Sequence, residues 1–283
     1  MATTDIYHVS GGLDGRPALR CLGGDVDDYI QVNAAAAASV AGNHTKGTIV
    51  AWINLADITG TYTIVGAGDD NVVEFLELNV EAGLLTARVT DGTTAQFVTQ
   101  ADAVGFKPHQ WYHVACVQNA DGHGVHLYIN GVEIAATNDT ATDVDSWFAE
   151  LDGIDTMRIG AANKGGAAAV TNEFKGGIGY VKLFSGTADT AALTATQVEE
   201  DFRGISNTTS LQNFWDWDDD LIDQGSGLDD GTNVGSGIVL NNNYSEFTSR
   251  FGFLTGTPVV ADKVKFAVDS NNNVGHAIVI QAA

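Results

Sequence analysis

The chain has 283 residues and carries 36 Asp and Glu against 13 Lys and Arg, which gives a net charge of −23. This charge excludes a protein that binds nucleic acid or an anionic membrane through a basic patch. Hydrophobic residues make up 44% of the chain, enough for a packed core, so a disordered acidic tail is excluded as well. The length fits one large β domain with an appendage, or two small domains.

The acidic residues are 27 Asp and only 9 Glu. Two explanations remain open: a calcium-rich or marine surface protein, or adaptation to high salt, where screening makes a dense negative surface tolerable. The two cysteines, Cys21 and Cys116, are too few for a disulfide framework, and we expect both to be small buried hydrophobic residues within strands.

The first 30 residues show no basic start, apolar run or cleavage site typical of a secretory signal peptide. No stretch reaches the roughly 18 apolar residues needed to span a bilayer, so we expect no membrane insertion. Free chain ends fray unless they are packed, and we expect both ends of this chain to be ordered within an assembly.

Short β-favouring segments, bounded by Gly, Asp or Asn, recur along the chain. They lie at residues 30–32, 48–53, 62–65, 72–78, 84–89, 111–117, 125–129 and 178–184. The pairs Asp91-Gly92, Asp121-Gly122 and Asn130-Gly131 are typical of tight hairpin turns. This pattern predicts an all-β antiparallel sandwich or jelly roll.

Helical patterns are scarce. Residues 33–40 are mostly Ala but have no polar face, which favours a loop or short turn. Residues 194–202 predict one or two helical turns, capped either by Thr194 or by Thr196, with Glu199 as the capping-box partner of Thr196.

After Gly204 the composition changes to Asp, Asn, Gly and Ser, and residues 259–280 provide two more candidate strands. We therefore predict an N-terminal arm at 1–16, a jelly roll at 17–205 and a small β-rich C-terminal extension at 206–283. The extension is a candidate assembly contact.

Four stretches carry a family pattern, in order and at a characteristic spacing: residues 18–32, 48–53, 111–132 and 158–194. Together they resemble the laminin-G-like and pentraxin-like jelly rolls, whose fold is concanavalin A-like. The resemblance implies two curved antiparallel sheets. We expect Trp52 and Trp111 to fill the core between these sheets.

Relatives with this fold include glycoside hydrolases and polysaccharide lyases as well as binding modules. A retaining hydrolase needs two carboxylates about 5–5.5 Å apart on one face. Glu74 and Glu77 are three residues apart, so on a strand they point to opposite faces. We therefore predict a protein that is not an enzyme.

The segment Trp215-Asp216-Trp217-Asp218 alternates aromatic and acidic residues, so the two Trp share one face. Two interpretations stay open. The Trp side chains belong to the core of a terminal strand, or they form a stacking surface for sugars. In the second case Trp215 and Trp217 are the glycan-binding residues.

The resemblance also implies a calcium site in the loop at residues 161–173. This loop has Asn163 and Lys164 where carboxylates are expected, and Gly179 and Tyr180 replace a further acidic pair. We therefore expect that site to be lost.

Other acidic clusters remain candidates, because calcium takes about 6–8 oxygen ligands. They are Asp25, Asp27 and Asp28; Asp69, Asp70 and Asn71; and residues 216–220 with Asp223. Of these, Asp69, Asp70 and Asn71 are our candidate metal ligands, and calcium is the one candidate cofactor. His123 and His126 lack the further ligands that zinc needs.

These observations predict a structural or binding protein. Our first hypothesis is a virion surface component, such as a capsid decoration, turret or fibre protein of a virus from a saline or marine host. It would assemble in the host cytoplasm with other shell proteins or with further copies of itself. The alternative is a glycan-binding adhesin or lectin-like module outside the cell, calcium-dependent or not, with host-surface glycans as partners. A polysaccharide-active enzyme ranks third.

Overall fold

The computed structural model describes residues 18–21, 28–92, 94–103, 105–151, 153–164, 170–217, 221–227, 229–235, 238–241, 264–268 and 274–280. The chain divides into two units, residues 1–242 and 243–283, and each is described by itself. The predicted arm at 1–16 and both chain ends lie outside the described residues.

The first unit contains two sheets, and every strand pair in them is antiparallel. In sheet A the order is β10 (Val132–Glu133), β9 (His126–Ile129), β8 (Trp111–Gln118), β3 (Lys46–Leu55), β15 (Gly176–Gly186), β1 (Ala18–Cys21) and β18 (Ile238–Asn241), and β16 (Leu211–Trp215) also pairs with β15. In sheet B the order is β11 (Ala136–Ala141), β7 (Thr94–Ala101), β6 (Leu84–Asp91), β5 (Phe75–Glu81), β4 (Thr61–Gly68), β12 (Thr156–Ile159), β2 (Tyr29–Gln31) and β17 (Thr232–Val234).

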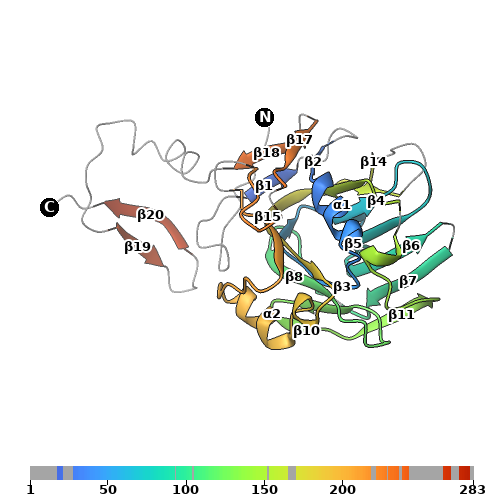
Figure 1. The fold of residues 1–283 in the computed structure, drawn as a ribbon. Helices are drawn as coiled ribbons and strands as arrows, with labels where there is room; N and C mark the ends of the chain where they lie inside the picture. Colours follow the sequence, from blue (N-terminus) through green and yellow to red (C-terminus); the bar gives the residue numbers. More distant parts are fainter. Residues whose placement is uncertain are drawn as a thin grey trace. The chain divides into compact units, whose positions relative to one another are not determined.

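The remaining elements connect the sheets or cover them. They are α1 (Asn33–Ala41), α2 (Ala195–Phe202), the 3₁₀ turns Phe148–Glu150 and Asp189–Ala191, and the small hairpin of β13 (Ala162–Asn163) and β14 (Val170–Thr171) (Figure 1). Among the described residues, no helix is long and apolar enough to cross a membrane. The predicted all-β sandwich is confirmed.

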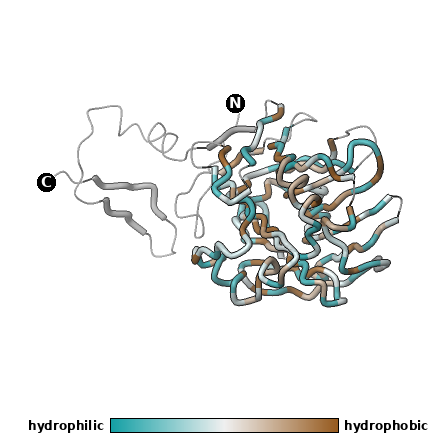
Figure 2. Tube along the Cα trace, viewed as in Figure 1, coloured by the Kyte–Doolittle hydropathy of each residue, from teal (hydrophilic) through white to brown (hydrophobic). Residues whose placement is uncertain are grey.

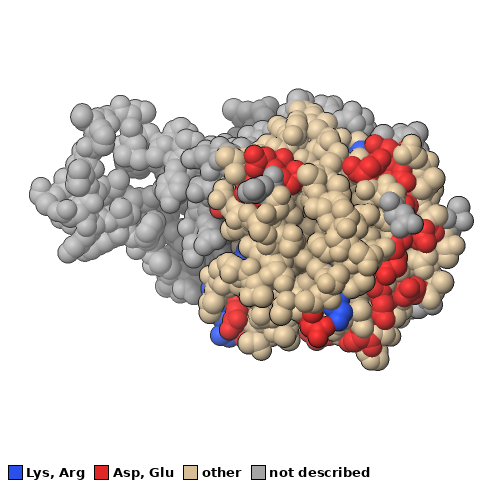
Figure 3. Space-filling model, viewed as in Figure 1, with Lys and Arg blue, Asp and Glu red and all other residues tan. Residues whose placement is uncertain are grey.

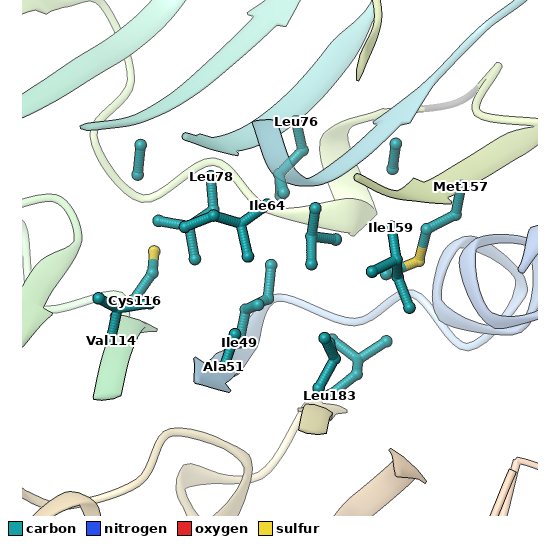
Figure 4. Packing of buried hydrophobic residues seen from close by; sticks show 14 of the residues in the cluster. Ile49, Ala51, Ile64, Leu76, Leu78, Val114, Cys116, Met157, Ile159 and Leu183 are labelled. Atoms are coloured by element: carbon teal, nitrogen blue, oxygen red, sulfur yellow. The ribbon is translucent and has the colours of Figure 1, made fainter. Parts of the chain in front are cut away.

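The core lies between the two sheets and follows strand alternation. Ile49 and Ala51 of sheet A face Ile64, Leu76 and Leu78 of sheet B (Figure 4). Apolar and polar residues alternate along many of these strands (Figure 2). Burial of this apolar surface is the main term that stabilises the sandwich.

Trp52 and Trp111 do not fill this core, contrary to our prediction. Because Ile49, Ala51 and Ile53 point inward on β3, Trp52 points to the opposite face of sheet A. There it is buried in a second apolar cluster, and Trp111 packs at the edge of that cluster. Cys21 and Cys116 are buried within strands, as predicted, and burial raises the pKa of both thiols.

Helix α1 occupies the segment that we predicted to be a loop. Ala is the strongest helix former, and the small side chains of Ala35, Ala36 and Ser39 let the helix pack closely against the sandwich without a polar face there. Its N-cap residue, Val32, provides no side-chain cap. Asp229 caps the helix instead, since its Oδ2 accepts a hydrogen bond from Ala35 N at 2.6 Å.

Helix α2 begins after Thr194, one of the two predicted caps. Thr194 Oγ1 accepts a hydrogen bond from Gln197 N, and Gln197 Oε1 accepts one from Thr194 N. This reciprocal capping box excludes the predicted Thr196 and Glu199 pair, because both residues lie inside the helix.

Three strands between residues 211 and 241 belong to the sandwich, although we predicted them in a C-terminal extension. They are β16 and β18 of sheet A and β17 of sheet B. The Asp- and Gly-rich composition of this region reflects the loops between these strands. In the second unit, β19 (Val264–Val268) and β20 (Val274–Ile280) form an antiparallel hairpin, within the segment predicted to hold two strands.

Candidate functional site

Much of the outer face of sheet A is covered. Helix α2 and the turn before it cover this face, which we call the sealed face (Figure 1). The ring of Trp52 stacks on Phe202 of α2, with ring centroids 5.8 Å apart. The buried members of the apolar cluster beneath the cover are Val50, Trp52, Ala115, Val117, Tyr128, Tyr180, Phe184, Ala192, Leu193, Val198 and Leu211.

A buried carboxylate organises the polar part of the sealed face. Asp201 of α2 is 1% exposed, its Oδ2 accepts from Lys182 Nζ at 2.5 Å, and its Oδ1 lies 3.2 Å from His113 Nε2. Tyr180 also donates to Oδ1. Burial would raise the pKa of Asp201, but the hydrogen bond with His113 and the charge of Lys182 outweigh it and lower the pKa. The network ties α2 to sheet A.

The outer face of sheet B is polar, and we call it the polar face. Strand register places two cross-strand rows on it. One row is Gln31, Arg158, Gly66, Glu77, Arg88 and Val98. The other row is Thr63, Asn79, Thr86, Gln100 and Thr137.

A chain of alternating charges runs along the polar face. Glu77 is buried, and its Oε2 lies 3.1 Å from Lys164 Nζ and 3.7 Å from Arg88 Nε. Arg88 also pairs with Glu81, and Glu77 Oε1 accepts from Thr63 Oγ1 at 2.5 Å. Burial alone would raise the pKa of Glu77, but Lys164, Thr63 and the other donors lower it, so the carboxylate stays ionised.

The hairpin of β13 and β14 covers one part of the polar face. Asn172 Nδ2 donates to Glu77 Oε1 at 3.2 Å, and Arg158 donates to Ala162 O at 3.2 Å. Towards β6 and β7 the face is more open: the side chains of Arg88 and Glu81 are 20% and 40% exposed. Gln100 Nε2 donates to Thr86 Oγ1 at 3.0 Å beside them.

The sequence did not single out the candidate residues on this face. The signal was present, because Leu76, Leu78 and Val80 alternate with Glu77, Asn79 and Glu81 along one strand. This alternation indicates one apolar and one polar face. The alternation does not indicate whether the outer side of a strand is covered by other elements or exposed to solvent.

Trp215 and Trp217 cannot form a stacking surface for sugars, because they are 0% and 1% exposed. Trp215 Nε1 donates to Asp229 O at 2.8 Å, and Trp217 Nε1 donates to Gly179 O. Both rings belong to the core, so the structure corrects their assignment as glycan-binding residues. The other interpretation, with both Trp in the core, is correct for their burial, but only Trp215 lies on the strand β16, and Trp217 follows its end.

Asp69, Asp70 and Asn71 do not converge as metal ligands. Asp69 Oδ1 accepts from Asn71 N at 2.5 Å, and Asp70 Oδ1 accepts from Asn163 Nδ2 at 2.5 Å. These bonds order the loop before β5, and Asn71 is exposed. Among the described residues, no group of three or more His, Cys, Asp or Glu could hold a metal ion.

The acidic segment around Asp223 is also organised without a metal. Asp223 is buried, and its two carboxylate oxygens accept from Phe214 N, Gly225 N, Asn213 Nδ2 and Asp229 N at 2.7–3.1 Å. These four donors use the lone pairs that a calcium ion would need. Of the other predicted ligands, Asp25, Asp27 and residues 218–220 lie outside the described residues.

The loop that holds calcium in pentraxin-like relatives does not fit the ion here. Lys164 places its ammonium 3.1 Å from Glu77 Oε2 and so brings positive charge to the carboxylate that faces this loop.

Glu74 and Glu77 have different partners: Glu74 Oε2 accepts from Gly153 N at 3.0 Å, whereas Glu77 lies on the polar face.

Residues 22–199 match the family model described as the concanavalin A-like lectin/glucanases superfamily. Because this match spans more than half of the chain, the chain belongs to this superfamily, and it matches the laminin-G type of domain. The superfamily contains both lectins and glucanases. No curated protein sequence matches the chain.

Solved structures with the same fold share little sequence with this chain. A proposed carbohydrate-binding protein of Bacteroides ovatus is 19% identical, with a TM-score of 0.52 over 80% of this chain and 59% of that one. The CBM40 of a Ruminococcus gnavus sialidase, bound to α2,3-sialyllactose, is 14% identical, with a TM-score of 0.49 over 62% and 93%. A heptameric pentraxin of Limulus polyphemus is 15% identical, with a TM-score of 0.46 over 80% and 88%.

Proposed function

We propose that this chain is a glycan-binding module without catalytic activity, and that the polar face of sheet B holds the glycan. The observation that carries this proposal is the contrast between the outer faces. A helix and an apolar cluster cover sheet A, whereas the polar face of sheet B keeps charged and amide side chains partly exposed. These are Arg88, Glu81 and Gln100, and they lie beside the buried polar residues Thr63, Glu77, Asn79 and Thr86.

The polar face has the chemistry that sugars require. A sugar hydroxyl both donates and accepts hydrogen bonds, so it is matched by amides, hydroxyls, carboxylates and guanidinium groups held in fixed positions. Arg88 is fixed between Glu77 and Glu81, and Gln100 is fixed on Thr86. Ligands bind best to groups that are already ordered.

Family membership supports the proposal, since this superfamily includes lectins. The Bacteroides ovatus protein, which shares the fold, is itself described as a proposed carbohydrate-binding protein. The glycan would be one outside the cell or on a cell surface.

A glycan array followed by titration calorimetry tests the proposal. We expect Gln100→Ala to weaken binding roughly tenfold, because it removes one amide from the open part of the face. Gln224→Ala is the matched control, since Gln224 is exposed in the loop that follows β16 of sheet A. The proposal fails if no glycan binds, or if both variants bind like the parent chain.

The virion hypothesis has no comparable support. Neither the family match nor the solved structures with this fold point to a shell protein. A location in a virion, or in a saline host, stays a prediction. Purification of the chain from virus particles would restore that hypothesis.

A further inference from the structure

The polar face carries three cations among the described residues, and each already has a partner. Arg158 is 4% exposed, donates to Ala162 O, and lies 4.7 Å from the centroid of the Tyr29 ring. Its guanidinium is therefore out of reach of a ligand. Lys164 lies 3.1 Å from Glu77 Oε2 and 5.8 Å from the centroid of the Phe75 ring.

Arg88 has two carboxylate partners. Glu77 lies 3.7 Å away on one side, and Glu81 forms an ion pair on the other. The charges of the four side chains Lys164, Arg88, Glu77 and Glu81 add up to zero. Residues 165–169, which connect β13 and β14, are Gly, Gly, Ala, Ala and Ala, so they add no charge.

An acidic glycan would meet repulsion at this face. Its carboxylate or sulfate needs an Arg fork or an ammonium group. It would have to displace Glu81 from Arg88, or approach the partly exposed Lys164 beside the ionised Glu77, which lies 3.1 Å from that ammonium. The field of the whole chain, with a net charge of −23, adds to this repulsion. Acidic side chains form several patches with few basic ones among them on the side shown in Figure 3.

A neutral glycan meets none of these costs. Its hydroxyls can donate to the carboxylate of Glu81, accept from Arg88 without separating the ion pair, and bond to the amide of Gln100. We therefore infer that the ligand class of the polar face is neutral oligosaccharides, without carboxylate or sulfate groups. This inference rests on the proposed function and narrows it.

Matched pairs of glycans test the inference. Suitable pairs are lactose with 3′-sialyllactose, lactose with its 6′-sulfated form, and xylo-oligosaccharides with and without glucuronic acid branches. We expect the neutral member of each pair that binds to bind at least tenfold more tightly in calorimetry at 0.15 M salt. At 1 M salt the difference should shrink, because salt screens the repulsion.

The variant Glu81→Gln tests the assigned cause. It leaves Arg88 with one carboxylate partner fewer, so we expect discrimination against the acidic member to fall several-fold. Glu133→Gln is the matched control, because Glu133 is also exposed but lies on β10 of sheet A. Unchanged urea midpoints would show that both variants fold.

The outcomes separate the two proposals. If acidic members bind as tightly as neutral ones or more tightly, the inference of a neutral ligand fails while glycan binding stands. If Glu81→Gln binds neutral and acidic glycans with the same affinity ratio as the parent chain, repulsion by Glu81 is not the cause of the preference, and the inference fails. If no glycan of either kind binds, the proposed function fails, and the inference fails with it.

Discussion

The sealed face of sheet A and the polar face of sheet B start from the same strand alternation and end differently. Each face has a buried carboxylate at its centre, Asp201 in one and Glu77 in the other, and each carboxylate is paired with a lysine. In sheet A the carboxylate comes from a helix that closes the face. In sheet B it comes from a strand, and only a small hairpin covers part of the face.

Under the proposed function, one face of the sandwich serves stability and the other serves recognition. A buried ion pair under a helix fixes that helix, since neither partner can leave without exposing a buried charge. On the partly exposed face of sheet B, the buried Glu77 pairs with Lys164 and Arg88, and both of these cations keep contact with solvent. Four measurements test this difference between the two faces, in decreasing order of the expected effect.

The largest effect is expected for Asp201→Ala. This change leaves the ammonium of Lys182, which is 5% exposed, without its counter-ion. Loss of one partner of a buried pair costs about 3–5 kcal/mol, and urea unfolding at pH 7 would measure it. Asp189→Ala is the control: Asp189 pairs with Lys46 in solvent, so its loss should barely move the urea midpoint. Equal losses would contradict the contrast.

Glu77→Gln should cost less, about 2 kcal/mol, because Lys164 keeps contact with solvent. The folded-state pKa of Glu77 is lowered, so its contribution is present above the unfolded pKa of about 4.3 and is lost as the pH falls through the folded pKa. The parent chain and the variant should therefore differ at pH 7 and converge as the pH falls below the unfolded pKa and through the lower folded pKa. A difference that grows in acid would refute this assignment.

Two turn glycines compare the faces directly. Gly131 and Gly92 both have positive φ, +78° and +58°, so Ala strains the backbone at either position. A Cβ at Gly131 would also lie 3.0 Å from Glu199 Cα and 3.2 Å from Phe202 Cβ of α2, whereas nothing lies within 4 Å at Gly92. We expect Gly131→Ala to cost about 1 kcal/mol more than Gly92→Ala in urea unfolding. Equal costs would mean that α2 does not press on this turn.

The smallest effect concerns His126, at the uncovered rim of sheet A. Its ring lies 2.7 Å from Glu133 Oε1 and 3.1 Å from Asp121 Oδ2. Burial lowers its pKa, but the two carboxylates outweigh burial and raise it. The contribution to stability, below about 1 kcal/mol, is complete below the unfolded pKa near 6.5 and is lost as the pH rises through the folded pKa. An NMR titration should give a midpoint above 6.5, and Glu133→Gln should lower it.

The sequence predicted the fold because its signals are local. The Asn130-Gly131 turn, the short alternating strands and the Thr194 cap each depend on neighbouring residues. The orientation of whole strands is not local. Which face of β3 carries Trp52, and whether Trp215 lies inside, depends on which strands pair and on what covers the sheet.

The candidate site was predicted less well, for the same reason. Rare residue types, such as Trp and clustered Asp, drew attention to Trp215 and Asp69, yet these serve the core and a loop. The polar face is built from common residues on neighbouring strands. The row that joins Glu77 to Arg88 and Arg158 exists only once the register of β5, β6 and β12 is known.

The capping of α1 by Asp229 has a consequence for synthesis of the protein. The hydrogen bond joins residues 194 positions apart, and the partner strands of β1 and β2 all lie beyond residue 155. During translation, β1 and β2 therefore have no partner strand, and α1 lacks its Asp229 cap, until more than half of the chain has been synthesised. Chaperones that protect nascent chains would therefore find their target in these first segments, and the sandwich would close only when its last strands arrive.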